Sequence, residues 1–212
     1  MKWFFICIIL FTSAGLYAGE TMYFPEGTFE QRDELKELDR EAIKGFSHFL
    51  STMQEPSLWE ISNKTKKEIY RFVLARTFQS TVCIRVEIQK SGNALVFLKV
   101  VPYGIEPHPE NLSTDECKNA SQNDVSTLKA KISKVNFWKI KPSDYPSLIE
   151  GEDGSFTVMA DGTSWFFEGI KNGKYQAFSV PNPTAPLFKA DEMVELGKIF
   201  LSLAKIEVEN LR

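Results

Sequence analysis

Apolar residues recur at three- and four-residue steps in three stretches of the chain, as they do along one face of an α-helix. These stretches are residues 30–53, 124–135 and 191–206. In the first, charged residues fill the opposite face, Thr28 is placed as an N-cap, and Pro56 prevents continuation. The spacing does not persist for the heptads that a coiled coil needs. It therefore favours packing on the domain's own sheet over a partner-binding segment.

Three β-strands are predicted between the first two helices, at residues 69–78, 81–89 and 94–101. The second strand alternates most clearly, with Val82 and Ile84 on one face and Cys83 and Arg85 on the other. This alternation predicts one core-facing side and one polar side. Residues 102–123 are polar and contain several prolines. They predict a loop of about twenty residues, which is longer than compact domains usually carry.

Two hairpin turns are expected between residues 155 and 181. Asp161-Gly162 and Asn172-Gly173 are each a preferred central pair of a two-residue type I′ turn, and strand-forming residues flank both. The sequence therefore predicts a three-stranded antiparallel meander, in which the short turns fix the register. The expected opposite pairs are Phe167 with Phe178, Trp165 with Val180, and Glu168 with Ala177.

Together these elements predict an α+β fold, with antiparallel sheet segments in β-meander hairpins covered by amphipathic helices. The expected order is roughly α-βββ-α-βββ-α. A length of 212 residues suits one ordinary domain, and 43% hydrophobic with 25% charged residues is typical of a chain that folds around a core. We assign residues 1–18 to a signal peptide, 19–28 to an irregular lead-in, and 29–207 to a single α+β domain.

The first 18 residues have the three-part layout of a secretory signal peptide. Lys2 supplies the positive start, residues 3–12 form an apolar run, and small residues precede Ala18. The run is about half as long as a bilayer-spanning helix, so no permanent membrane anchor is predicted. Cleavage near Ala18 would leave a periplasmic or secreted protein. The net charge of −3 gives no basic field for phosphate backbones, so nucleic acid is not an expected partner.

Without its signal peptide the chain contains two cysteines, Cys83 and Cys117. Because exported proteins live where thiols tend to oxidise, we predict a disulfide between them. That bridge would close a loop of about 35 residues and stabilise the fold by about 3 to 4 kcal/mol. Two independent free thiols are the alternative.

Glu168 is the one acidic residue inside an aromatic strand, and the expected register places it diagonally across from Tyr175 on the same face. If that face lines a pocket, burial would raise the pKa of Glu168. Glu168 and Tyr175 would then be candidate proton-transfer or ligand-binding residues. The alternative is a structural acid that pairs with Arg71, Arg76 or Arg85, or one that faces solvent.

The sequence lacks motifs for several other chemistries. His48, His108 and the two cysteines do not have zinc-ligand spacing and no EF-hand loop occurs, so no metal site is predicted. Neither a Gly-x-Ser-x-Gly nucleophile turn nor a glycine-rich phosphate loop is found, and no cofactor is expected. Three glycosylation-type sequons, at Asn63, Asn111 and Asn119, would matter in a eukaryotic host.

The segment Asp161-Gly162-Thr163-Ser164-Trp165-Phe166-Phe167-Glu168-Gly169, followed by Gly173-Lys174-Tyr175, resembles a pattern of uncharacterised exported bacterial proteins. That pattern is Asp-Gly-x-x-Trp-x-x-Glu-Gly and then Gly-x-Tyr. Arg76-Thr77-Phe78 and Phe137-Trp138 are similar to the same group, so the resemblance covers about residues 69–183. It implies a bacterial envelope setting and no particular activity.

These features lead us to expect an exported, soluble, non-catalytic domain that binds another protein. An immunity-type protein that neutralises an exported toxin is one form of this hypothesis. The alternative is a small hydrolase or ligand-binding protein with a pocket around Glu168, Tyr175 and a nearby arginine.

Overall fold

A six-stranded antiparallel sheet forms the centre of the fold, in the strand order β4-β3-β2-β1-β7-β8. The computed structural model describes residues 23–30, 32–146, 148–150, 156–158, 163–185 and 189–206. The strands of the sheet are β1 (Glu68–Arg76), β2 (Thr81–Ile88), β3 (Ala94–Val101), β4 (Thr114–Ala120), β7 (Thr163–Lys171) and β8 (Lys174–Pro181). A separate two-stranded sheet pairs β5 (Leu148–Glu150) with β6 (Phe156–Val158). The predicted α+β class is confirmed.

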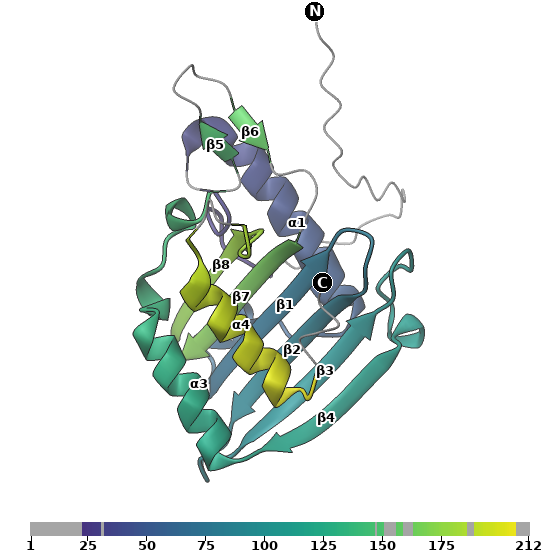
Figure 1. Cartoon of the computed structure of the whole chain (residues 1–212), viewed down its shortest axis with the longest axis vertical. Coiled ribbons are helices and arrows are strands. Elements are labelled where there is room, and N and C mark those ends of the chain that lie inside the picture. The colour runs from purple at the N-terminus through teal and green to yellow at the C-terminus, as the bar shows by residue number, and fades with distance from the viewer. Residues whose placement is uncertain are drawn as a thin grey trace, which may run out of the picture.

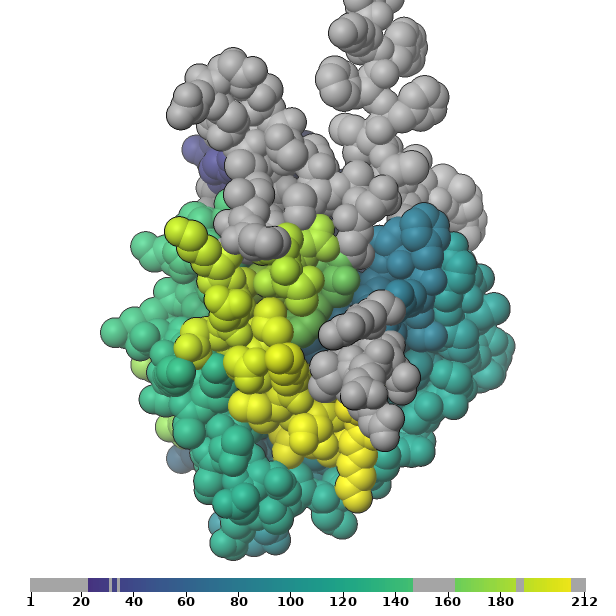
Figure 2. Space-filling model, in the orientation of Figure 1, coloured from purple at the N-terminus to yellow at the C-terminus, as the bar shows by residue number. Residues whose placement is uncertain are grey.

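Helices lie on both faces of the large sheet (Figure 1). On one face lie α3 (Gln122–Lys134) and α4 (Asp191–Leu203), and α1 (Lys36–Thr52) lies behind the other. The short helix α2 (Leu58–Ser62) packs beside β7 and β8. Figure 2 shows α4, in yellow, across the middle of its face. Short 3₁₀ turns span Asp33–Leu35, Pro109–Asn111, Phe137–Lys139 and Pro142–Asp144.

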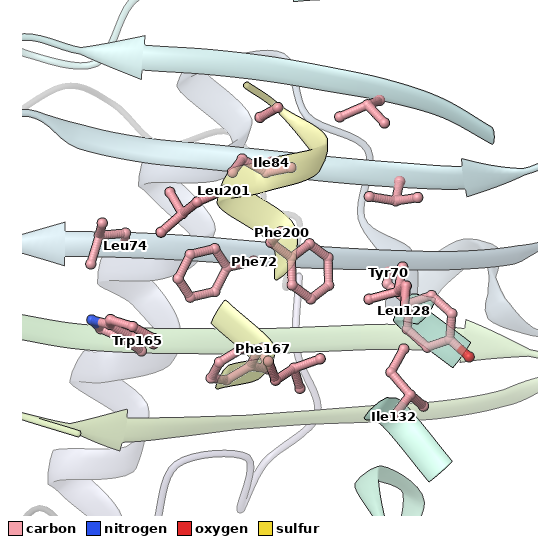
Figure 3. Packing of buried hydrophobic residues seen from close by; sticks show 14 of the residues in the cluster. Tyr70, Phe72, Leu74, Ile84, Leu128, Ile132, Trp165, Phe167, Phe200 and Leu201 are labelled. Atoms are coloured by element: carbon pink, nitrogen blue, oxygen red, sulfur yellow. The ribbon is translucent and has the colours of Figure 1, made fainter. Parts of the chain in front are cut away.

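The core between the sheet and α4 is built from aromatic rings (Figure 3). Phe72 of β1 lies opposite Phe167 of β7, and their ring centroids are 5.0 Å apart. Phe200 of α4 stacks on Phe72 at 5.5 Å. The Trp165 ring packs so closely on α4 that a Cβ at Gly197 would lie 2.6 Å from Trp165 Cε3. Glycine at position 197 is what allows this approach.

A second core lies on the α1 face. Phe166 of β7 points to this side because side chains alternate along a strand, and three rings surround it. These are Phe24, Phe29 and Phe46, with centroids between 5.1 and 5.6 Å from that of Phe166. Phe24 belongs to the predicted lead-in, so residues 23–28 are irregular in backbone but packed into the domain.

The first helix begins later than the sequence predicted. α1 starts at Lys36 after a 3₁₀ turn, and Thr28 is not its N-cap. The buried Asp39 explains the difference, because its carboxylate accepts three backbone N–H groups of the preceding segment. The donors are Gly27 at 2.6 Å, Phe29 at 2.8 Å and Glu30 at 3.1 Å. These hydrogen bonds fix residues 27–30 against α1 in a bent, non-helical conformation.

The long polar loop predicted at residues 102–123 contains a strand, so that expectation was wrong. β4 pairs with β3 from Val100↔Thr114 to Ala94↔Ala120. Most of its side chains are exposed, and its sequence has no apolar alternation. Backbone hydrogen bonds to β3 rather than side-chain burial therefore define this edge strand, which a hydrophobic pattern does not reveal.

The hairpin at Asn172-Gly173 is confirmed, with all three expected pairs in register. Both turn residues have positive φ, 52° and 78°, as a type I′ turn requires. The three-stranded meander is not formed, because β6 pairs with β5 and the second neighbour of β7 is β1. Strand β7 is buried along most of its length, which suits a position inside the sheet. The expected Asp161-Gly162 turn lies outside the described residues.

The signal peptide expected at residues 1–18 also lies outside the described residues. In the part of the chain that the structure covers, none of the helices combines the length and the apolar character needed to cross a bilayer.

Candidate functional site

The two predicted site residues, Glu168 and Tyr175, lie together on the α1 face of the sheet. Tyr175 of β8 donates its hydroxyl hydrogen to Glu168 Oε1 at 2.9 Å. Arg71 Nη1 donates to Glu168 Oε2 at 2.9 Å from the neighbouring strand β1. The side chains of Arg71 and Glu168 are both fully buried. Of the alternatives that the sequence left open, the structure shows the pair with Arg71.

This pair belongs to a larger buried cluster of charges. Arg71, Arg85 and Lys99 stand on three adjacent strands, β1, β2 and β3, and all face α1. Glu55, in the connection between α1 and α2, lies among them. Its carboxylate is 2.8 Å from Arg85 Nε, 3.2 Å from Lys99 Nζ and 3.5 Å from Arg71 Nε. Arg71 and Arg85 are directly opposite each other, and this like-charge contact would be unfavourable without Glu55 between them.

The backbone around Glu55 is held by the same side chains. Lys99 Nζ donates to the Met53 carbonyl at 2.6 Å, and Arg71 Nη2 donates to the Pro56 carbonyl. The Tyr23 hydroxyl donates to the Glu55 carbonyl at 2.7 Å. The turn from α1 to α2 is therefore fixed onto three strands of the sheet by charge-assisted hydrogen bonds.

The two buried carboxylates differ in the direction of their pKa shifts. Burial raises the pKa of Glu55, but the positive charges of Arg71, Arg85 and Lys99 outweigh burial and leave that pKa below its usual value. Burial raises the pKa of Glu168 to about 7, because one arginine and one tyrosine hydrogen bond offset desolvation only in part. Burial, reinforced by the nearby Glu168 charge, also raises the pKa of Tyr175.

A pKa near 7 would suit proton transfer, but Glu168 has no exposed surface. A hollow on the molecule is lined by the segment 135–145, which follows α3, and by Lys189, and neither Glu168 nor Tyr175 contributes to it. As it stands, the cluster connects the α1–α2 turn to the sheet. Glu168 is therefore not accessible to a substrate in this structure.

The predicted disulfide between Cys83 and Cys117 is not formed, and both thiols are free. Cys83 lies on β2 opposite Lys99, and Cys117 lies on β4 opposite Phe97. Strand β3 stands between them, so their Cα atoms are separated by two strand spacings, about 9 to 10 Å sideways. That separation exceeds the reach of a disulfide.

An exposed aromatic patch, which the sequence reasoning did not single out, lies at one end of the sheet. Its members are Phe78, Tyr103 and Ile105, with 69%, 58% and 47% of their surfaces exposed. The Phe78 and Tyr103 rings meet edge to face, with centroids 5.9 Å apart. Figure 1 shows that the β1–β2 turn and the β3–β4 connection, which carry these residues, emerge at the same end of the sheet. We call this surface the Phe78 patch.

Phe78 adopts an unusual backbone conformation. Its φ is +63°, in the left-handed region that bulky side chains rarely occupy. The turn is closed by Arg76, whose guanidinium group donates to the Ser80 carbonyl at 3.1 Å. The sequence predicted a strand up to Phe78, but β1 ends at Arg76. The polar Gln79-Ser80 pair was the signal that Phe78 lies in the turn.

No protein-family model matches the chain, and comparisons with curated proteins and with solved structures find no match. Within the described residues, no group of three or more His, Cys, Asp or Glu side chains is placed to hold a metal ion.

Proposed function

We propose that this chain is an exported, non-catalytic protein-binding domain, and that it recognises its partner through the Phe78 patch. The observation that carries the proposal is the exposed edge-to-face pair of Phe78 and Tyr103. Aromatic side chains dominate the energetics of protein interfaces, and contiguous exposed apolar surface on a soluble domain often marks an interaction site.

The backbone of Phe78 supports the same conclusion. A left-handed conformation costs a bulky residue about 1 kcal/mol or more, and such strain tends to be kept where it serves binding. A glycine in this turn would avoid the strain but would present no ring. The turn therefore accepts a less favourable backbone in order to expose an aromatic side chain.

The acidic residues of the connection that carries Tyr103 and Ile105 suggest the chemistry of the partner. Glu106 and Glu110 are both exposed in the same β3–β4 connection as Tyr103 and Ile105. We infer a partner protein with an apolar pocket for the rings and basic residues at its rim. An exported toxin neutralised by an immunity-type protein is the specific form we propose, in the periplasmic or extracellular setting that the signal sequence suggests.

The enzyme hypothesis has less support. It requires Glu168 and Tyr175 to line a pocket, whereas Glu168 is fully buried and bound to Arg71. A binding role needs no opening of the fold, because the Phe78 patch is already at the surface.

The test is capture of partners from a periplasmic or culture-fluid extract by the immobilised chain. The patch variant carries Phe78→Ser and Tyr103→Ser, and the control carries Leu38→Ser, which removes a half-exposed apolar residue from α1. We expect a protein that is bound by wild type and the control but lost with the patch variant.

The captured protein is then purified and its Kd measured by calorimetry. Loss of both rings should weaken binding by about 30-fold or more, as removal of interface hot spots does. Equal binding by the patch variant, or capture of nothing that depends on the patch, would overturn the proposal.

A further inference from the structure

The outer edge of β4 is open among the described residues, because β4 stands last in the strand order. Figure 1 shows it along the border of the sheet. An open edge presents unpaired backbone N–H and C=O groups to another chain. The side chains of β4 are mostly exposed, and its central residue is the free thiol Cys117.

The direction of these backbone groups follows from the neighbouring hairpin. Gln89 N donates to Asn93 O at 2.8 Å, so Gln89 and Asn93 form a hydrogen-bonded pair between β2 and β3. Along two antiparallel strands, hydrogen-bonded pairs alternate with pairs that are not hydrogen-bonded. A residue whose backbone bonds to the strand on one side therefore does not bond to the strand on the other side. It follows that every second residue of β4 forms backbone hydrogen bonds with β3. The residues whose backbone groups point outward are Asp115, Cys117 and Asn119.

The charge pattern of β4 is complementary to itself about Cys117. If a second copy of β4 runs antiparallel with Cys117 opposite Cys117, Glu116 of each copy lies opposite Lys118 of the other. Two other registers also let the outward-pointing backbone groups of the two copies bond to each other. One places Glu116 opposite Glu116, and the other places Lys118 opposite Lys118. Each brings two like charges together, which is unfavourable. The register centred on Cys117 also overlaps all seven residues of the strand.

We propose that two copies of this chain pair through β4 about a two-fold axis at Cys117, and that a disulfide between the two Cys117 residues can lock the dimer. The result is one continuous twelve-stranded sheet. A two-fold contact of this kind closes on itself and leaves no further open β4 edge.

The Cα separation in the proposed pairing is compatible with a disulfide. Opposite residues in a hydrogen-bonded antiparallel pair have Cα atoms about 5.5 Å apart, within the disulfide range. Their Cβ atoms are also about 5.5 Å apart, roughly 1 Å more than a disulfide allows, so the bridge requires a local twist of the two strands at Cys117. Its formation joins two Sγ atoms and removes two electrons and two protons from the thiols. An external disulfide accepts them by exchange and is released as two thiols, and oxidised glutathione serves as the probe. Cys83 takes no part, because it is buried on β2.

The test uses the full chain treated with oxidised or reduced glutathione. Under oxidising conditions we expect a dimer on non-reducing gels, with the linkage mapped to Cys117 by mass spectrometry. Cys117→Ser should abolish the covalent dimer, whereas Cys83→Ala should retain it. A chain that stays monomeric under oxidation, or a linkage through Cys83, would overturn the proposal.

The register is tested separately from the disulfide, by sedimentation in reductant. In Lys118→Glu the new carboxylate of each copy lies opposite Glu116 of the other copy. These two repulsive contacts should weaken the reversible dimer about tenfold. The double variant Glu116→Lys/Lys118→Glu should restore it. Asp115→Pro should also disrupt pairing, because proline removes an outward N–H while leaving the bonds to β3, and Asp115→Ala is its control. If no variant changes association, or no reversible dimer forms, edge pairing is wrong.

Circular dichroism and thermal unfolding of each variant show whether the fold is intact. The substituted side chains of β4 are exposed or half-buried, apart from the buried Cys83 on β2, where alanine removes only the sulfur atom. We therefore expect unchanged monomer folds. These experiments do not involve the Phe78 patch, so their failure leaves the proposed binding function in place.

Discussion

Arg71 and Glu168 lie directly opposite each other on β1 and β7, with Arg71 Nη1 2.9 Å from Glu168 Oε2 and neither side chain exposed. Buried ion pairs are not strong stabilisers compared with apolar residues of the same shape, but breaking one leaves a charge without its partner. We therefore expect removal of one partner to destabilise the fold by more than the intact pair stabilises it.

Replacement of Glu168 by Ala should destabilise the fold by about 3 kcal/mol. Arg71 would keep its buried charge with only the Glu55 carboxylate, 3.5 Å away, to balance it. Tyr175 would lose its acceptor. Urea unfolding of wild type and variant measures the difference. The control is Glu192→Ala, which removes a surface carboxylate paired with two lysines and should change stability little. Similar effects of the two substitutions would show that the buried pair has no special role.

The stability of the protein should depend on pH through Glu168. Its pKa rises from about 4.5 in the unfolded chain to about 7 in the folded state, so between these values the folded state binds more protons. The free energy of unfolding, relative to that of Glu168→Gln, should therefore fall as pH rises from 4.5 to 7, by up to about 1 kcal/mol per pH unit. Below pH 4.5 the contribution is fully present.

Unfolding curves of both proteins between pH 4 and 8 provide this measurement. Subtraction of the variant removes contributions shared by both proteins, including those of other carboxylates. Glu68 is one such group, because it has its pKa lowered by hydrogen bonds and lysines despite partial burial. A difference that increases with pH across the window would contradict the raised pKa of Glu168.

Two glycine-to-alanine substitutions in helices should have opposite effects. At Gly197 in α4 a Cβ would collide with the Trp165 ring, so Gly197→Ala should destabilise the fold by about 2 to 3 kcal/mol. At Gly45 in α1 nothing lies within 4 Å, so Gly45→Ala should stabilise it by about 0.5 to 1 kcal/mol through helix propensity. Thermal unfolding of the two variants tests the packing of α4 on β7. Equal changes in melting temperature would mean that the Trp165 ring does not pack against Gly197.

Phe78→Gly should be more stable than Phe78→Ala by about 1 kcal/mol. Both substitutions remove the exposed ring, but only glycine accepts a φ of +63° without strain. Chemical unfolding of the two variants isolates the backbone contribution. Alanine being the more stable of the two would mean that the turn does not hold a left-handed residue. Both variants should lose patch-dependent binding.

Local patterns predicted the elements that depend on neighbouring residues. The spacing of apolar positions predicted α3 and α4 to within a few residues, and Asn172-Gly173 fixed the register of β7 with β8. The same register placed Glu168 on one face with Tyr175. These predictions succeeded because helix periodicity, strand alternation and a two-residue turn are all set over short stretches of chain.

Contacts between distant segments were beyond the reach of these patterns. Strand β4 has polar, exposed side chains, so only its pairing with β3 reveals it, and that pairing separates Cys83 from Cys117. Similarly, the placement of β1 beside β7 gave Glu168 its arginine. Phe78 is exposed because of a turn conformation that its aromatic character alone would not suggest.

The sequence by itself determined the fold class, the main helices and strands, and the short list of residues that could carry chemistry. Only the tertiary structure decided that Glu168 is sealed in an ion pair, that the thiols lie too far apart to join, and that Phe78 and Tyr103 meet at the surface. The physical reason is that secondary structure follows from interactions along a few residues of backbone. Burial, pairing and exposure depend on which distant strands and helices pack together.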